Sequence, residues 1–224
     1  MNIVIIGTGY VGLVTGVGLA SLGNVVNFID LDENKIKDLS SKKITFYEPG
    51  LEEYFNDDET FKRMSFFTDY ASIEWDNIDI VFVCVQTPNN IETNSVDTKF
   101  LESAIKEINN VNNSDLVITV KSTIPPYEIE KVCEKVGMDS SKLTFNPEFL
   151  REGTAVEDFF KPDRIVLGGT DTEKLTKLKE LYSGFDCEII TTDSISSQLI
   201  KYLANTYLPL RLSFVNEATR LIDY

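Results

Sequence analysis

The 224-residue sequence contains no histidine. This absence excludes Ser-His-Asp and Cys-His catalysis, histidine metal ligands and a histidine proton shuttle. Any catalysis must therefore use the side chains of Lys, Asp, Glu, Cys, Ser, Thr or Tyr.

Cysteines and long apolar runs are also scarce. Only three cysteines are present, and Cys84, Cys133 and Cys187 form no CxxC pair. Their spacing argues against a zinc site and favours free thiols in a reducing compartment. The sequence has no apolar run of about 18 residues, and Met1 leads directly into an apolar segment rather than a signal peptide. We therefore expect a cytoplasmic protein with no metal site and no membrane association.

Basic residues are outnumbered, with 21 Lys and Arg against 36 Asp and Glu and a formal net charge of −15. Nucleic acids and anionic membrane surfaces both bind cationic protein surfaces, so neither partner is expected. The hydrophobic fraction of 42% is typical of a globular protein that folds around its own core.

Short β-branched runs alternate with helical stretches along most of the chain. Strands are predicted over residues 3–6, 25–29, 80–85, 116–120, 143–145, 164–167 and 188–190. Helices are predicted over residues 11–22, 31–39, 100–108, 127–136 and 172–182. Continuously apolar strands that alternate with helices predict an α/β fold, a doubly wound and mainly parallel sheet with helices on both faces.

The last part of the sequence, from Ser194 to Tyr224, predicts one long helix, which divides the chain into residues 1–193 and 194–224. Apolar residues lie all around this helix, so we expect a second subunit or a further domain to cover it. Pro209 predicts a kink within the helix. The chain ends inside this helix without a stop signal, so we expect a truncated protein.

The segment Gly7-Thr-Gly9-Tyr-Val-Gly12 follows a predicted strand and opens a predicted helix. The first glycine permits a tight turn, the second lets a pyrophosphate approach the backbone, and the third lets helix and strand pack closely. Asp30 ends the next predicted strand, where a carboxylate binds the ribose hydroxyls and repels a 2′-phosphate. A glycine-rich turn with a helix-capping aspartate is the alternative. The complete pattern predicts an NAD site in a Rossmann-like domain.

Further segments resemble the UDP-glucose/GDP-mannose dehydrogenase family, in the family's order and over nearly the whole chain. They are Gly9–Leu13, Tyr47–Leu51, Gln86–Pro88, Lys121–Pro125, Asn146–Gly153, Lys161–Val166, Lys201–Asn205 and Phe214–Glu217. The resemblance implies NAD-dependent oxidation of the C6 alcohol of a nucleotide sugar by two hydride transfers. It favours UDP-glucose as substrate and UDP-glucuronate as product, within nucleotide-sugar metabolism and polysaccharide biosynthesis.

The resemblance also implies residue roles. The cofactor-binding positions are Gly7, Gly9, Tyr10, Val11, Gly12, Asp30, Lys35, Thr87, Thr123 and Glu152. The substrate-binding positions are Glu148, Phe149, Leu150, Arg151, Lys201 and Asn205, and the catalytic ones are Thr123, Glu148, Lys201 and Asn205.

Among the catalytic positions, Glu148 matches a general base or water-activating acid of the family. Lys201 and Asn205 match groups that bind the sugar and stabilise an oxyanion, and their i, i+4 spacing places them on one helix face. The alternatives are a solvated helix lysine and an acid at a helix N-terminus. Gln198 stands where many family members have Glu, which leaves the support of Lys201 in doubt.

In this family the second oxidation uses a cysteine in a glycine-rich loop after the long helix, and the chain stops before that region. We therefore expect the isolated chain to bind NAD without making a sugar acid. Family members commonly pair through the central helix, so a homodimer is expected. Two alternatives are another Rossmann dehydrogenase of the 6-phosphogluconate or hydroxyacid type, and a non-catalytic module that binds NAD and dimerises.

Overall fold

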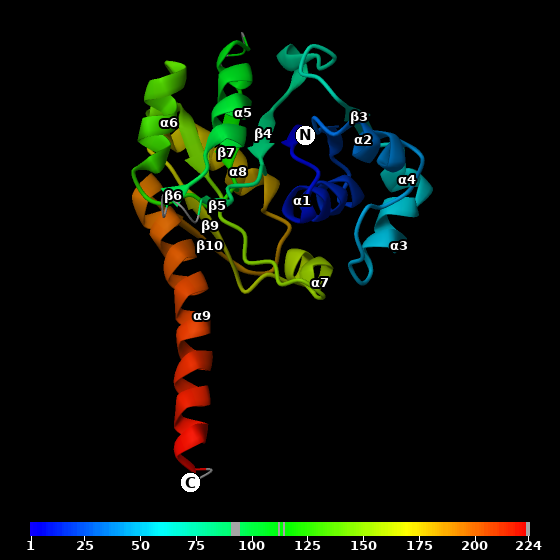
Figure 1. The fold of residues 1–224 in the computed structure, drawn as a ribbon. Coiled ribbons are helices and arrows are strands. Elements are labelled where there is room, and N and C mark those ends of the chain that lie inside the picture. Colours follow the sequence, from blue (N-terminus) through cyan, green and yellow to red (C-terminus); the bar gives the residue numbers. More distant parts are fainter. Residues whose placement is uncertain (91–94, 112, 114, 223–224) are drawn as a thin grey trace.

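The computed structural model describes residues 1–90, 95–111, 113 and 115–222. A sheet flanked by helices forms the body of the protein, and one long helix extends away from it (Figure 1). None of the described helices has both the length and the hydropathy needed to cross a membrane.

The sheet has eight strands in the order β10-β9-β8-β7-β4-β1-β2-β3. Their bounds are β1 (Asn2–Ile6), β2 (Val25–Ile29), β3 (Met64–Phe67), β4 (Ile80–Val83), β7 (Val117–Val120), β8 (Leu143–Phe145), β9 (Arg164–Gly168) and β10 (Glu188–Thr192). The strands from β3 to β8 pair in parallel, whereas β8 meets β9 antiparallel through the pair Phe145 and Gly168. The order β3-β2-β1-β4-β7-β8 is that of a dinucleotide-binding sheet, and it confirms the predicted fold class.

Strand β1 is apolar from Ile3 to Ile6 because helices cover both of its faces. Ile3 and Ile5 pack into the cluster that contains α1 (Tyr10–Ser21) and α7 (Ala155–Phe160). Val4 and Ile6 point the other way, into the cluster that contains α5 (Lys99–Asn109) and α6 (Glu128–Val136). Further helices are α2 (Glu33–Ser40), α3 (Leu51–Asn56), α4 (Asp58–Phe61), α8 (Thr172–Leu181) and two 3-10 turns (Trp75–Asn77 and Ser140–Lys142). Strands β5 (Asn89–Asn90) and β6 (Ser95–Val96) pair with each other.

The long helix α9 (Ser194–Ile222) continues through Pro209, so the proline does not end it. Residues 223 and 224, which the predicted helix includes, lie outside the described residues. The start of α9 packs on β8 and β9. Its later part extends from the body (Figure 1) and exposes more than half of each large apolar side chain, namely Leu203, Tyr207, Leu208, Leu210, Leu212, Phe214, Val215 and Leu221.

Glu48 connects two distant parts of the fold. Its carboxylate is buried and accepts hydrogen bonds from Gly153 N at 2.9 Å and Ala155 N at 2.7 Å. The hydroxyl of Tyr10, the first residue of α1, donates to the same carboxylate at 3.0 Å. Glu48 thus satisfies backbone donors at the start of α7 and holds this segment next to the glycine-rich loop.

We predict that Glu48→Ala lowers the free energy of unfolding by about 3 kcal/mol, because it leaves the backbone N–H groups of Gly153 and Ala155 without their acceptor. Urea denaturation followed by circular dichroism measures this loss. The control is Glu53→Ala, which removes an exposed carboxylate from α3. Equal stability of the two variants would show that the buried carboxylate does not hold the segment.

Candidate functional site

The glycine-rich loop is shaped by close backbone contacts at its two ends. Gly7 has a φ of +95°, and a Cβ there would lie 2.7 Å from the carbonyl oxygen of Cys84. A Cβ on Gly12 would lie 1.9 Å from the carbonyl oxygen of Gly7. Gly9 differs, since nothing lies within 4 Å of the position of its Cβ. The fold therefore needs Gly7 and Gly12, whereas Gly9 leaves open space that a ligand can fill.

Helix α1 begins directly after this open space. Its first turn has neither a side-chain cap nor an acidic residue. The first N–H groups of a helix lack intrahelical acceptors, and they carry the positive end of the helix dipole. The N-terminus of α1 therefore fits a pyrophosphate, even in a protein of net charge −15.

Asp30 lies at the end of β2, beside a cavity of about 370 Å³ that is also lined by Gly7, Gly9 and Lys35. Its carboxylate accepts hydrogen bonds from Thr8 N at 2.8 Å and Thr8 Oγ1 at 2.7 Å, and Lys35 Nζ lies 3.7 Å away. Burial acts to raise the pKa of Asp30, but these hydrogen bonds and the lysine charge outweigh it and lower the pKa. The ionised carboxylate suits the hydroxyls of a ribose.

Leu31, Tyr70 and Phe100 also line the cavity, and sequence analysis assigned no role to them. Leu31 and Phe100 are 65% and 50% exposed. Burial raises the pKa of the Tyr70 hydroxyl, so it stays neutral. Apolar and aromatic side chains near a ribose-binding carboxylate suit an adenine ring. Only the exposure of Leu31 and Phe100 in the folded chain reveals this surface.

The predicted cofactor residues divide into two groups. Gly7, Gly9, Asp30 and Lys35 line the cavity. The others lie outside its lining, namely Tyr10, Val11, Gly12, Thr87, Thr123 and Glu152. The hydroxyl of Tyr10 shares its proton between Glu48 Oε2 at 3.0 Å and the carbonyl oxygen of Arg151 at 2.8 Å, and Thr87 Oγ1 donates to the carbonyl of Thr123 at 2.7 Å.

Glu148 and Lys201 form an ion pair at the same edge of the sheet. Glu148 follows β8, whereas Lys201 lies on α9, 53 residues further along the chain. Lys201 Nζ lies 2.7 Å from Glu148 Oε1 and also donates to the Glu148 carbonyl. The second carboxylate oxygen accepts from Leu150 N at 2.7 Å. Both side chains are therefore held in one orientation, with Lys201 only 6% exposed.

Of the other predicted catalytic residues, Thr123 lies near this ion pair. Thr123 and Lys201 line the same small cavity, together with Gln198. The amide nitrogen of Gln198 donates to the carbonyl of Ser194 at 2.9 Å, and its oxygen has no hydrogen-bond partner among the described residues. The structure thus brings Thr123, Glu148 and Lys201 together.

Two substrate residues lie further out. Asn205 lies one turn beyond Lys201 on α9 and is exposed. Arg151 is exposed and pairs with Asp158, with Nη2 at 2.6 Å and Nε at 3.1 Å from its carboxylate oxygens. Phe149 packs under two cations, with the Arg164 guanidinium 4.4 Å and the Lys201 ammonium 5.5 Å from the ring centre.

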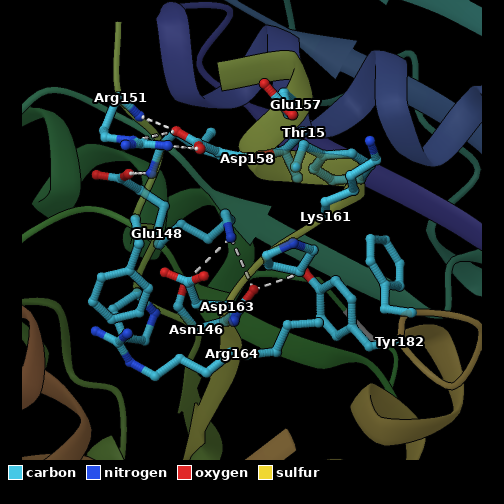
Figure 2. Close-up of a pocket in the computed structure, with 18 residues that line it drawn as sticks. Thr15, Asn146, Glu148, Arg151, Glu157, Asp158, Lys161, Asp163, Arg164 and Tyr182 are labelled. Atoms are coloured by element: carbon cyan, nitrogen blue, oxygen red, sulfur yellow. Dashed lines mark hydrogen bonds and ion pairs between the residues drawn. The ribbon is translucent and has the colours of Figure 1, made fainter. Parts of the chain in front are cut away.

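A buried polar network beside the ion pair was missed by sequence analysis. Lys121 Nζ lies 2.9 Å from Asn146 Oδ1, and the Tyr182 hydroxyl donates to the same oxygen at 2.7 Å. Figure 2 shows Asn146 and Tyr182 meeting at the cavity of about 400 Å³ that the network lines. Burial lowers the pKa of Lys121. A lysine directly after an apolar strand run was the available signal.

Comparison with known proteins identifies the family to which this chain belongs. A family model described as the UDP-glucose/GDP-mannose dehydrogenase family, NAD binding domain, matches residues 1–186. The chain belongs to this family. The assignment confirms the resemblance seen in the sequence and selects it over the 6-phosphogluconate and hydroxyacid types, and NAD is the cofactor of the matched domain.

Several family members are similar over the whole chain. The UDP-glucose 6-dehydrogenase of Rickettsia prowazekii (strain Madrid E) is 37% identical over 228 residues, covering 100% of this chain and 52% of that protein. UDP-glucose 6-dehydrogenase YwqF of Bacillus subtilis (strain 168) is 37% identical over 231 residues, covering 100% of this chain and 51% of that protein. The chain therefore spans about half the length of the curated relatives it matches.

The fold is also that of solved family members. The GDP-mannose dehydrogenase of Pseudomonas aeruginosa gives a TM-score of 0.89 at 29% identity, covering 97% of this chain and 52% of that one. A UDP-glucose dehydrogenase of Pyrobaculum islandicum gives a TM-score of 0.86 at 34% identity, with the same coverage.

The buried ammonium of Lys121 predicts a pH-dependent difference in stability. Because its folded-state pKa lies below the ordinary 10.5, the unfolded chain binds more protons between these two values. The stability contributed by this group therefore rises with pH in that window. We expect Lys121→Met to lose stability relative to the wild type as pH rises from neutral towards about 10.

Urea denaturation at several pH values measures this difference. Tyr182→Phe is the control, because it alters the same network without removing a group that titrates below pH about 10. A constant difference between Lys121→Met and the wild type would contradict the lowered pKa.

Proposed function

We propose that this chain binds NAD and contributes Glu148 and Lys201 to oxidation of the C6 alcohol of a nucleotide sugar. UDP-glucose is the proposed substrate and UDP-glucuronate the product, formed by two hydride transfers. The observation that carries this proposal is the 2.7 Å ion pair between two residues 53 positions apart. The pair lies at the carboxyl edge of the sheet, which also holds the cavity beside Asp30.

The cofactor is assigned to the cavity at the ends of β1, β2 and β4. The backbone at Gly9 and the N-terminus of α1 hold the pyrophosphate, Asp30 and Lys35 the ribose, and Leu31 and Phe100 the adenine. NAD supplies the acceptor for the hydride. We also assign Tyr10, Val11, Thr87, Thr123 and Glu152 to positions around it, as the family resemblance implies.

Lys201 and Glu148 perform the proton and charge chemistry in this proposal. The Lys201 ammonium stabilises negative charge on the sugar oxygen, and it acts strongly because it is shielded from water. Glu148 accepts the hydroxyl proton or activates water, with Thr123 beside it. Asn205 adds an amide donor from the next turn of α9, and the backbone of Phe149, Leu150 and Arg151 contacts the substrate.

The cysteines of this chain do not fit the second oxidation, which we assign to a thiolate nucleophile. Burial raises the pKa of Cys84 to about 12 and that of Cys133 to about 11. Burial also raises the pKa of Cys187. At neutral pH all three are thiols, which are weak nucleophiles. We therefore propose that the chain alone binds NAD without producing a sugar acid.

We propose that a second copy of the protein covers the later part of α9. In this proposal the chain consists of a cofactor domain, residues 1–193, and a connecting helix, residues 194–224. Apolar side chains on several faces of an extended helix are typical of a surface that is buried on assembly. The exposed residues from Leu203 to Leu221 support this assignment.

The cofactor assignment predicts that Gly9→Ala weakens NAD binding by about tenfold or more, because the added methyl group enters space assigned to the pyrophosphate. The melting temperature should stay unchanged, since a Cβ at Gly9 meets no protein atom within 4 Å. Isothermal titration calorimetry measures the affinity. Gly184→Ala is the matched control, because its Cβ also meets nothing within 4 Å. Equal NAD affinity of both variants would refute the assignment.

The catalytic assignment requires the complementary part of a relative. With this chain joined to the C-terminal half of Bacillus subtilis YwqF, we expect Lys201→Met to lower kcat for UDP-glucose by about 10²-fold or more. NADH absorbance measures the rate. Lys179→Met, on the exposed surface of α8, is the control and should keep the parent rate. An active Lys201→Met variant would exclude the proposed role of Lys201.

A further inference from the structure

Every polar atom of Asn146, in the backbone and in the side chain, forms a hydrogen bond. Its backbone N donates to the carbonyl of Val120 at 3.0 Å, and its side-chain nitrogen donates to the carbonyl of Val166 at 2.9 Å. Its carbonyl accepts from Lys121 Nζ at 3.3 Å, and Oδ1 accepts from both Lys121 and Tyr182. The residue is 3% exposed. Bonds to the end of β7, to the middle of β9 and to the residue after α8 therefore fix it in place.

Lys121 is an unusual choice for this position. Its side chain is buried, and among the described residues its ammonium forms hydrogen bonds only to oxygens of Asn146. The ammonium nitrogen lies 5.7 Å from the centre of the Phe82 ring. No carboxylate of the described chain forms an ion pair with it. Burying an unpaired charge costs free energy, and an apolar side chain of similar volume often stabilises a core better. Stability alone therefore does not account for a lysine here.

A short and stiff connection links Asn146 to Glu148. Pro147 stands between them, and a proline restricts its own φ and the conformation of the preceding residue. A residue fixed before the proline therefore sets the direction of the chain after it. Lys201 holds the other end of this connection through the carbonyl and the carboxylate of Glu148.

We propose that Lys121 is a positioning residue, whose ammonium holds Asn146 and thereby places the Glu148 carboxylate against Lys201. This inference rests on the proposed function of Glu148 and Lys201, and it assigns to the chain a second lysine that acts without touching the substrate. A misplacement of about 1 Å in an acid-base group lowers a rate by about 10²-fold, so such a device has a clear use.

The test uses NMR on the chain itself, without substrate or cofactor. Protected lysine ammonium groups give resolved ¹H–¹⁵N signals, and a scalar coupling across the hydrogen bond connects Lys201 Nζ with the Glu148 carboxylate carbon. Lys121→Met should abolish this coupling while the backbone spectrum away from the site and the melting temperature show a folded protein. Lys121→Gln is a second uncharged variant, for use if the methionine variant does not fold.

Two further variants separate the charge from packing. Lys121→Arg keeps a cation and should retain the coupling. Tyr182→Phe removes the other donor to Asn146 Oδ1 and leaves the ammonium, so it should retain the coupling as well. Persistence of the coupling in a folded uncharged variant would overturn the proposal. Loss of the coupling in Tyr182→Phe to the same extent would also overturn the proposal. Any disturbance of the packing around Asn146 would then explain the loss, without a specific role for the Lys121 charge.

NAD titration of the same variants keeps this result separate from the proposed function. The coupling is measured without NAD, so a chain that does not bind NAD still tests the role of Lys121. Conversely, Lys121→Met should keep the wild-type affinity for NAD, since Lys121 does not line the cavity beside Asp30.

Discussion

Backbone packing at Gly7 is the constraint on which the rest of the site depends. Neither the contact of Gly7 with the Cys84 carbonyl nor that of Gly12 with Gly7 leaves room for a side chain. These contacts bring the start of α1 against the end of β4. The cavity beside Asp30 exists because the chain turns this tightly at the centre of the sheet. The open space at Gly9 is then the part of the loop that the fold itself does not use.

Much of the architecture could be predicted because its signals are local. Strand β4 and residues 3–6 of β1 are continuously apolar, since helices cover both faces, and β2 and β8 match their predicted bounds. Strand β3 (Met64–Phe67) was missed because it is a four-residue edge strand without a β-branched run. Helices α3, α4 and α7 were also missed, because four to six residues are too few to show a helical period.

The functional site likewise contains residues that could be predicted from local sequence and residues that could not. The positions of Gly7, Gly9 and Asp30 follow from spacing, because the motif lies within one strand-helix-strand unit. Glu148 and Lys201 were found through family resemblance, since no local pattern connects a loop after β8 with a turn of α9. The burial of Glu48 was missed, because it arises only when segments about 100 residues apart pack together. The burial of Lys121 was missed because it depends on Asn146, which follows the neighbouring strand β8, 25 residues further along the chain.

The later turns of α9 are the part of the fold whose order depends on a covering surface. A single helix surrounded by water is only marginally stable, because its hydrogen bonds compete with solvent and its apolar surface gains nothing from folding. Beyond Leu203 the described chain offers α9 little burial. Without a covering partner these turns fray in solution. In the proposed assembly of two copies, their folding is coupled to association, and the folded fraction then rises with protein concentration.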